Sequence, residues 1–425
     1  MEFSVIRSKR SLVRPAEQTP SITLDLSIVD RLPAMTYNVE TLHVFKHGPQ
    51  AATVIRQALS KALVPYYPLA GRQKESSQGY LQVECTGDGV WFIEASTGCT
   101  LGSVNNFDNF DSIPYADLLP DQIPETESID PLVKMQVTEF ACGGFVIGLI
   151  FCHCICDGLG AAQFLNAIGE LARGLENPSI APVWHRDFFP PPPEHSNATA
   201  MKSLPPLPVA NYKLKHENID IPFDKIHKLK QEFHEVTGQS CSAFEIVAAG
   251  CWRSRIQAIE FKESTQVKLV FFANCRHLLD PPLPKGFYGN CFFPVKITAS
   301  CESLTRASLF DVVKMIQEAK AKLPLEFFKY FNGDHLKDGS VEDPFASPPS
   351  FNTLFISEWA RLGLNKVDYG WGPPVDIIPI HSFSSIPVAF VGSLPLPKEG
   401  VRLITWCVEE ARSQTFLDYM TKLIA

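Results

Sequence analysis

The sequence lacks any apolar run near the ~20 residues that a membrane-spanning helix needs. Its first ten residues carry charge early and are not followed by a long apolar segment. We therefore expect neither a membrane span nor a secretory signal, and we expect a soluble cytoplasmic protein. Positive charge is also in deficit, because 38 Lys and Arg stand against 46 Asp and Glu, a formal net charge of −8. This balance argues against nucleic acid as the main partner.

Further absences narrow the possibilities. No glycine-rich phosphate loop follows a predicted strand, so neither ATP nor NAD is indicated and we expect no bound cofactor. The sequence also has no internal repeat of the 20–50-residue kind that marks a repeat protein. No heptad pattern or exposed edge strand demands a partner, so a monomer is expected.

Twelve cysteines are present, but their surroundings argue against disulfide bonds. Several lie among apolar residues, where a free thiol behaves as a small hydrophobic group, and cytosolic thiols are kept reduced. The alternation of Cys152, Cys154 and Cys156 around His153 suggests a metal site at first sight. Its spacing is not that of zinc ligands, and no second Cys/His pair lies near it in the sequence. We therefore expect no metal.

The length of 425 residues predicts two domains of roughly 200 residues each. The most visible boundary is a proline-rich stretch at 189–208, which is typical of an extended crossover rather than a packed element. We divide the chain into an N-terminal domain at 1–185, a linker at 186–214 and a C-terminal domain at 215–425. Both halves mix strands with helices, which favours α/β two-layer domains over a doubly wound nucleotide-binding fold.

Residue spacing predicts individual elements within both halves. Helices are expected where apolar residues recur with helical spacing, at 51–63, 242–259, 309–323 and 415–423. Strands are expected at 80–85, 90–94, 132–140, 144–151, 267–273 and 401–408. Glycine-containing turns at 86–89 and 143–144 predict two hairpins.

His153 is the first candidate functional residue. It follows an apolar run at 145–151 that predicts a buried strand, and it precedes a predicted helix at 159–175. Imidazole is the usual general base near neutral pH, although an isolated histidine is more often a core residue hydrogen-bonded to backbone. Asp157, four residues later, could orient the imidazole as a triad carboxylate does. It could instead turn away and pair with an arginine, which would hold the loop in shape.

A second unusual stretch lies more than 200 residues away, at 367–374. It contains two glycines, a tryptophan and two prolines in eight positions, so it cannot be a regular helix. Asp368, Gly370, Trp371 and Gly372 are its candidate structural residues. The plain interpretation is a turn anchored by an aromatic side chain. The functional interpretation is a rigid loop that closes a domain interface.

Together the two stretches make the chain resemble a known family. His153-Cys-Ile-Cys-Asp157 and Asp368-Tyr-Gly-Trp-Gly372 are similar to the H-x-x-x-D and D-F-G-W-G motifs of the plant BAHD acyl-CoA-dependent acyltransferases. Further matches are found at 66–72, 83–89, 136–138, 142–145 and 281–290. The last block resembles the branch with grass p-coumaroyl-CoA monolignol transferases and taxane acyltransferases. Tyr369 stands where the family usually has Phe, and its hydroxyl needs a partner if it is buried.

The resemblance implies two domains with mixed sheets, each like chloramphenicol acetyltransferase, joined by a long crossover loop. It also implies a tunnel that acyl-CoA enters from one face and the acceptor from the other, with His153 midway as the general base. By family position, Ser357 and Trp359 are candidates to stabilise the oxyanion, although Ser357 could equally be an ordinary loop hydroxyl. No acyl-enzyme is required, so none of the cysteines need be a nucleophile.

The remaining candidate residues are assigned supporting roles. Asp157 is expected to point toward Arg276, and Asp368 to fix its own loop rather than to take part in chemistry. The phosphates of CoA need cations or helix N-termini. Ser240 and Ser242, at a predicted helix start, are candidates for this role, and an ordinary N-cap is the alternative for them.

The leading hypothesis is an acyl-CoA-dependent O-acyltransferase of plant specialised metabolism. Its donor would be a hydroxycinnamoyl, benzoyl or acetyl thioester, and its acceptor a small-molecule alcohol. One alternative is N-acylation of an amine, which uses the same base. A second alternative is a non-catalytic ligand-binding protein with the same fold, although retention of His153 and the Asp368 loop argues against it.

Overall fold

The computed structural model describes residues 3–32, 35–107, 115–121, 123, 130–188, 212–332, 344–345, 350–381 and 386–424. Most of the predicted linker at 186–214 therefore lies outside the described residues. The chain divides into two compact units. Unit 1 consists of Met1–Leu204, Leu279–Cys291 and Arg361–Ile380, and unit 2 of Pro205–Leu278, Phe292–Ala360 and His381–Ala425.

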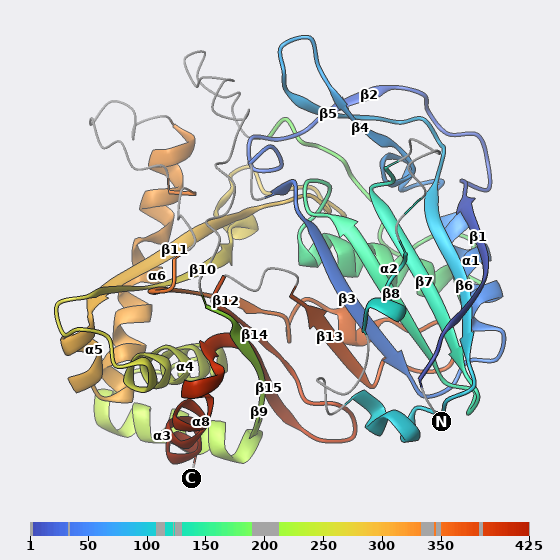
Figure 1. The fold of residues 1–425 in the computed structure, drawn as a ribbon. Coiled ribbons are helices and arrows are strands. Elements are labelled where there is room, and N and C mark those ends of the chain that lie inside the picture. Colours follow the sequence, from blue (N-terminus) through green and yellow to red (C-terminus); the bar gives the residue numbers. More distant parts are fainter. Residues whose placement is uncertain are drawn as a thin grey trace. The chain divides into compact units, whose positions relative to one another are not determined.

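Unit 1 is built on a six-stranded sheet with the strand order β1-β6-β7-β8-β3-β13 (Figure 1). Its strands are β1 (Ile6–Val13), β3 (Asn38–Phe45), β6 (Val90–Thr97), β7 (Val133–Phe140), β8 (Phe145–Cys152) and β13 (Asp376–Ile380). β6 and β7 run parallel and the other neighbours antiparallel, so the sheet is mixed. A smaller antiparallel sheet joins β2 (Thr23–Asp25), β5 (Leu81–Glu84) and β4 (Arg72–Glu75).

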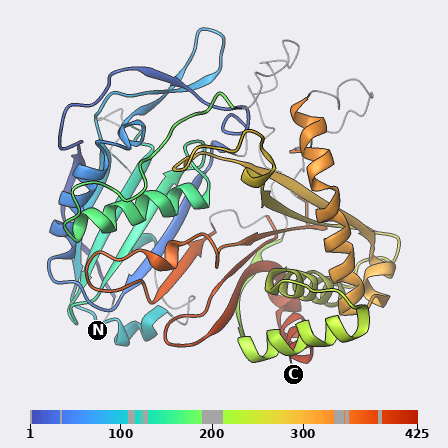
Figure 2. The same ribbon diagram turned by 180° about the vertical axis from the view of Figure 1, so that it is seen from behind.

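Two helices, α1 (Ala51–Ala62) and α2 (Gly158–Ala172), pack against each other and lie over one face of the large sheet (Figure 2). Glu139 of β7 accepts a hydrogen bond from the Ala52 N–H of α1 at 3.1 Å, which identifies the side of the sheet that α1 covers. Short 3₁₀ helices connect these elements at Tyr67–Ala70, Gly102–Phe107, Tyr115–Asp117 and Leu364–Lys366.

One predicted hairpin is confirmed and the other is wrong. β7 and β8 form an antiparallel pair around the predicted turn at 143–144. β5 and β6 do not pair with each other, because β5 pairs with β2 and β4 and β6 pairs with β1 and β7. Gly89 directly precedes β6, whose residue Val90 pairs with Val13 at the end of β1, and a Cβ on Gly89 would come within 2.1 Å of the Val13 carbonyl oxygen. The glycine therefore allows a close approach to the end of β1 and is not part of a tight hairpin turn.

Unit 1 includes two segments from the second half of the sequence. β13 pairs with β3 in antiparallel register, with Ile378 opposite Leu42. The segment 279–291 lies against α2, where a Cβ on Gly160 would come within 1.9 Å of the Tyr288 carbonyl oxygen. The division by sequence placed both segments, and with them the Asp368 loop, in the C-terminal half.

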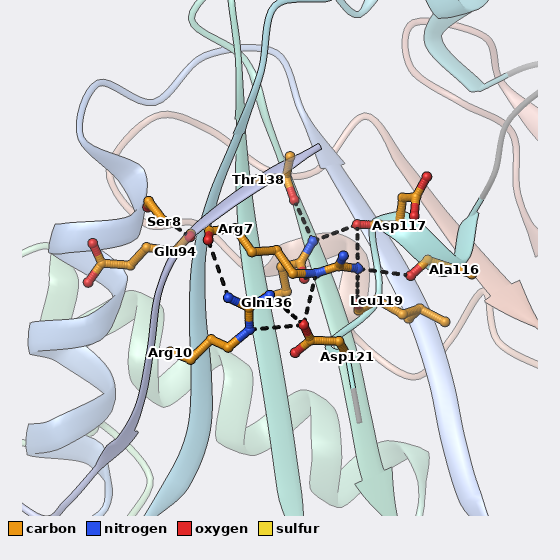
Figure 3. A network of polar contacts seen from close by, with 10 residues as sticks. All are labelled: Arg7, Ser8, Arg10, Glu94, Ala116, Asp117, Leu119, Asp121, Gln136 and Thr138. Carbon is orange, nitrogen blue, oxygen red and sulfur yellow. Dashed lines mark hydrogen bonds and ion pairs between the residues drawn. The ribbon is translucent and has the colours of Figure 1, made fainter. Parts of the chain in front are cut away.

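The sheet face opposite α1 is crossed by the segment 115–121, which Arg7 fixes (Figure 3). Gln136 and Glu139 are three residues apart on β7, so their side chains point to opposite faces of the sheet. The Gln136 side-chain oxygen accepts from Arg7 Nε at 2.9 Å. A second nitrogen of Arg7 donates to the backbone carbonyls of Ala116, Asp117 and Leu119. Leu118 lies so close to β8 that a Cβ on Gly148 would be 2.0 Å from its carbonyl oxygen. One face of the sheet is thus covered by helices, and the segment 115–121 lies on the other.

Unit 2 repeats the plan of a mixed sheet covered by helices. Its strand order is β11-β10-β12-β14-β15-β9, with β10, β12 and β14 parallel to one another. The strands are β9 (Leu214–Pro222), β10 (Gln266–Asn274), β11 (Phe292–Ser300), β12 (Thr353–Glu358), β14 (Val388–Ser393) and β15 (Gly400–Glu409). The helices are α3 (Phe223–Thr237), α4 (Ala243–Ile259), α5 (Cys301–Arg306), α6 (Leu309–Phe331) and α8 (Glu410–Ile424), and a 3₁₀ turn spans Arg276–Leu278. The predicted α/β architecture with mixed sheets is confirmed.

α6 extends beyond its predicted end. The sequence predicts a stop at 323, before Pro324, but the helix continues to Phe331. Four of the seven residues at 325–331 are aromatic, and Phe327 is buried with its ring 5.9 Å from that of Phe293. Packing of this ring offsets the backbone hydrogen bond that the proline removes. Among the described helices, none has the length and apolar character that crossing a lipid bilayer requires.

Candidate active site

His153 lies in the short loop between β8 and α2, as the sequence predicts. The side chain is half-buried. Its backbone N–H donates to the Tyr37 carbonyl at 3.1 Å, and its own carbonyl accepts from Asn290 Nδ2 at 2.8 Å. The peptide groups on both sides of the His153 Cα are therefore fixed by hydrogen bonds. Such a loop can hold an imidazole in one direction.

Asp157 ends this loop and is the N-cap of α2. Its Oδ1 accepts from the Gly160 N–H at 3.0 Å, and its Oδ2 accepts from the Cys291 N–H at 3.3 Å. The buried carboxylate thus ties the loop to the helix and to the segment 279–291. These bonds support a structural role. Arg276 belongs to unit 2, and its pairing with Asp157 stays a prediction.

Three buried side chains that sequence reasoning did not single out hold the same loop. Asp30 accepts from Asn290 Nδ2 at 2.7 Å and forms an ion pair with Arg186 Nε at 3.2 Å. Arg186 also donates to the Ile155 carbonyl at 2.6 Å. Asn290 lies in the matched block 281–290, but neither Asp30 nor Arg186 carried a sequence signal, since charged residues are usually exposed.

The thiols on either side of His153, those of Cys152 and Cys154, form a hydrogen bond with each other. Cys152 and Cys154 Sγ lie 2.9 Å apart, and the Gln73 amide donates to both. The hydrogen bond between them lowers the pKa of Cys152 and raises that of Cys154, and burial raises the pKa of Cys156. All twelve cysteines are free thiols. The arrangement supports a packing role for the pair.

The Asp368 loop is organised by its own carboxylate. Asp368 Oδ1 accepts from the backbone N–H groups of Gly370 and Gly372, at 2.8 and 2.9 Å. The two glycines have φ of +109° and +92°, a region in which other residues are strained. This geometry explains the spacing of the motif, because the carboxylate gathers two N–H groups that only a glycine-rich turn can turn toward it. It supports a structural role for Asp368.

The aromatic residues of this loop pack on the sheet of unit 1. Tyr369 is buried with its ring 5.5 Å from that of Phe45, and the Trp371 ring lies 5.8 Å from that of Phe145. The rings of Phe45 and Phe145 stack on each other at 4.6 Å. Burial raises the pKa of Tyr369. The tyrosine therefore keeps the apolar packing that a phenylalanine would provide, and its hydroxyl stays neutral.

The structure does not bring the Asp368 loop to His153. Phe145, which contacts Trp371, is the first residue of β8, whereas His153 follows the last. Eight residue steps of about 3.3 Å separate the two ends by roughly 26 Å. The loop instead contacts the far end of α2, where Arg173 donates to the Asp368 carbonyl. The predicted role in closing a domain interface stays a prediction.

Ser357 and Trp359 lie together in unit 2, at the end of β12. The Trp359 indole N–H donates to Ser357 Oγ at 3.2 Å, and the Trp359 ring packs at 5.2 Å against that of Phe390. Because the serine oxygen accepts this bond, its hydroxyl hydrogen can be donated elsewhere. The pair is a suitable hydrogen-bond donor for an oxyanion, and its assignment to that role stays a prediction.

Ser242 is the N-cap of α4, which was the alternative interpretation. Its side chain accepts from the Glu245 N–H, and the Glu245 carboxylate accepts from the Ser242 N–H in a capping box. Lys320 pairs with the same carboxylate at 2.5 Å, and Gln317 donates to the Ser240 carbonyl. An anion already caps this helix terminus. Binding of CoA by Ser240 and Ser242 stays a prediction.

Among the described residues, no group of three or more His, Cys, Asp and Glu side chains is arranged to hold a metal ion.

Comparison with known proteins identifies the family. A model of the Transferase family matches residues 3–405. The chain is 42% identical over 441 residues to Acyl transferase 4 of Oryza sativa subsp. japonica, covering 98% of each protein. It is 37% identical over 440 residues to myricetin 3-O-glucosyl 1,2-rhamnoside 6'-O-caffeoyltransferase AT2 of Crocosmia x crocosmiiflora, covering 99% of each. It is 33% identical over 438 residues to 3'-N-debenzoyl-2'-deoxytaxol N-benzoyltransferase of Taxus canadensis, covering 100% of this chain and 97% of that one.

Solved structures show the same fold. Vinorine synthase matches with a TM-score of 0.72 at 20% identity, covering 99% of this chain and 98% of that one. F. sporotrichioides TRI101, solved with coenzyme A and T-2, matches with a TM-score of 0.72 at 15% identity, covering 95% and 99%.

Two mixed α/β units, one of which presents a histidine between strand and helix, define a two-domain acyltransferase fold. The chain belongs to the Transferase family of BAHD acyl-CoA-dependent acyltransferases, as the sequence resemblance predicts.

Proposed function

We propose that the protein transfers an acyl group from a CoA thioester to a hydroxyl of a small plant metabolite, with His153 as the general base. Family membership supports the reaction class. The observation that carries the assignment of the base is the fixed loop at 153–157, because backbone hydrogen bonds on both sides of the His153 Cα fix the position from which the imidazole projects.

The proposed chemistry is direct transfer. His153 takes the proton of the acceptor hydroxyl as its oxygen attacks the thioester carbonyl. The tetrahedral intermediate places negative charge on the carbonyl oxygen, which needs hydrogen-bond donors. Ser357 is the candidate donor and Trp359 its orienting partner. When the intermediate collapses, the carbon–sulfur bond breaks and the protonated imidazole returns its proton to the CoA thiolate.

The substrate classes are proposed from the relatives. Their names specify transfer of caffeoyl, benzoyl and acetyl groups. We therefore propose a hydroxycinnamoyl, benzoyl or acetyl donor. The caffeoyl and acetyl transferases are named as acting at oxygen and the benzoyltransferase at nitrogen. The more similar caffeoyltransferase favours a hydroxyl acceptor, and an amine is the second candidate. We also propose that the enzyme acts as a cytoplasmic monomer.

The test is release of free CoA thiol from a panel of acyl-CoAs, each with alcohol acceptors, amine acceptors or none. His153→Ala should lower the acceptor-dependent rate by roughly 10²–10⁴. His47→Ala, at an exposed histidine of unit 1, is the matched control and should keep the rate. Turnover with alcohols alone supports O-acylation and turnover with amines alone the second candidate. If no pair gives His153-dependent turnover, the protein is a non-catalytic member of the family.

A further inference from the structure

The loop that carries His153 is attached to a buried ion pair. Asp30 and Arg186 lie 3.2 Å apart, with side-chain exposures of 0% and 3%. Asp30 is fixed in its own turn, because its carboxylate accepts from the Ser27 N–H at 3.0 Å and its N–H donates to the Ser27 hydroxyl at 3.2 Å. The carboxylate is therefore a rigid reference point inside unit 1.

Arg186 is held just as firmly. Its guanidinium lies 4.2 Å from the Trp184 ring centroid and 5.3 Å from that of Tyr288, distances at which cation–π attraction is effective. A Cβ on Gly289 would lie 1.1 Å from Arg186 Nη1, so the guanidinium lies directly against the backbone there. A buried ion pair is expensive to desolvate and is weak evidence for stability. We therefore consider which parts of the His153 loop the ion pair holds in place.

The ion pair reaches the His153 loop at two backbone carbonyls. Arg186 donates directly to the Ile155 carbonyl at 2.6 Å. Asn290 makes the second connection, because its fully buried Nδ2 donates to Asp30 Oδ1 at 2.7 Å and to the His153 carbonyl at 2.8 Å. The amide has two hydrogens and both are used. The Asn290 amide therefore connects the fixed Asp30 carboxylate to the backbone carbonyl of His153.

We propose that Asn290, backed by the Asp30–Arg186 pair, is a positioning residue that sets the direction of the His153 imidazole. Holding the His153 carbonyl fixes the peptide plane that follows the base, and Tyr37 fixes the one that precedes it. The Cα–Cβ direction is then determined, and only side-chain torsions remain. This inference rests on the proposed function, since direction matters only if His153 is the base.

The first test compares two truncated amides. Asn290→Ala should lower kcat by roughly 10- to 100-fold, the order of loss caused by a misplacement of about 1 Å. The KM for acyl-CoA should change by less than about threefold, because substrate binding is untouched. The matched control is Asn166→Ala on α2, whose amide also donates to two backbone carbonyls, those of Ala162 and Gly363. This control should keep kcat. Wild-type kcat in Asn290→Ala overturns the proposal.

The second test separates positioning from folding by exchanging the two side chains. In the double variant Asp30→Asn with Asn290→Asp, an amide and a carboxylate still face each other and the net charge is conserved. The contact between the two positions can re-form, but the new carboxylate cannot donate to the His153 carbonyl. The exchange should therefore raise Tm relative to Asn290→Asp alone while kcat stays as low as in Asn290→Ala. Recovery of wild-type kcat by the exchange contradicts the proposal.

A third measurement needs no activity. His153 is the only histidine followed by cysteine in the sequence, so ¹³C-carbonyl histidine with ¹⁵N-cysteine labels one peptide for NMR. Loss of the donated hydrogen bond in Asn290→Ala should move the His153 carbonyl signal upfield, and Asn166→Ala should leave it in place. An unmoved signal refutes the positioning contact. Absence of turnover in the wild-type protein would instead refute the proposed function, so the two failures are distinguishable.

Discussion

Replacing Asp157 distinguishes two roles for its carboxylate: a structural role, in which it ties the His153 loop to α2 and to the segment 279–291, and the role of a triad carboxylate that orients the imidazole. Asp157→Ala removes the N-cap of α2, a loss of about 0.5–2 kcal/mol in free energy of unfolding. It also leaves the buried N–H of Cys291 without this acceptor, which costs about 1–3 kcal/mol. The two terms together predict a loss of roughly 1.5–5 kcal/mol.

Asp157→Asn should be milder than the alanine variant. The remaining side-chain oxygen can still accept from the Gly160 N–H, so the cap is kept. Of the two backbone hydrogen bonds that Asp157 accepts, the one from Cys291 is lost, because the new amide nitrogen faces another donor, and this loss should cost about 1–3 kcal/mol. If the role of Asp157 is structural, it affects the rate only through the geometry of the His153 loop. Asp157→Asn should therefore also retain clearly more kcat than Asp157→Ala.

The assay pairs urea unfolding with kcat at saturating acyl-CoA for both variants. Ser308→Ala, which removes the N-cap of α6 in unit 2, controls for cap loss away from the site and should leave kcat unchanged. A triad carboxylate behaves differently, because an Asp-to-Asn change there lowers kcat by about 10⁴ with the geometry intact. The structural role is refuted if both Asp157 variants lose kcat equally, by about 10⁴, while Asp157→Asn keeps its stability.

Three further predictions concern packing, thiols and pH. Gly160→Ala should destabilise unit 1 by roughly 1–3 kcal/mol in urea unfolding, because its Cβ would meet the Tyr288 carbonyl at 1.9 Å, whereas Gly102→Ala meets nothing closer than 3.9 Å and should be neutral. Cys154→Ala should retain acceptor-dependent thiol release, since no acyl-enzyme is required, and its abolition would indicate a covalent mechanism. Burial lowers the pKa of His43 to about 4, below its unfolded value of about 6.5, so between these values the unfolded state binds more protons. The free energy of unfolding should therefore fall by up to roughly 3 kcal/mol as the pH drops from about 6.5 to 4, and urea titrations of His43→Gln should show a shallower fall.

The local features of the site could be read from the sequence. An apolar run ending at His153 followed by a helical pattern predicts a strand, a loop and a helix, and β8 and α2 have these positions. The glycine turn at 143–144 predicts the β7–β8 hairpin. The serine at 242 predicts the start of α4. In each case the determining interactions lie within a few residues, so the pattern contains them.

The long-range features could not be read in this way. β13 pairs with β3 across more than 300 residues, and no local periodicity records which strand is its neighbour. Asp30 and Arg186 are charged, and a charged residue predicts an exposed side chain until its buried partner is known. The glycines at 86–89 have the composition of a hairpin turn, but the contact that decides their role is with Val13 on another strand.

The positions of the two motifs indicate how the second one acts. β8 spans roughly 26 Å and the fifteen residues of α2 about 22 Å, so both elements run from the His153 loop to the Asp368 loop. α2 is held at its first turn by Asp157. At its other end Arg173 donates to the Asp368 carbonyl, and a Cβ on Gly169 would come within 2.5 Å of the same oxygen. α2 also packs against α1 between these two ends, so the end contacts add to a position that packing already fixes. The Asp368 loop is thus tied to the helix whose N-cap closes the loop of the base, and its contact lies at the end of that helix away from His153.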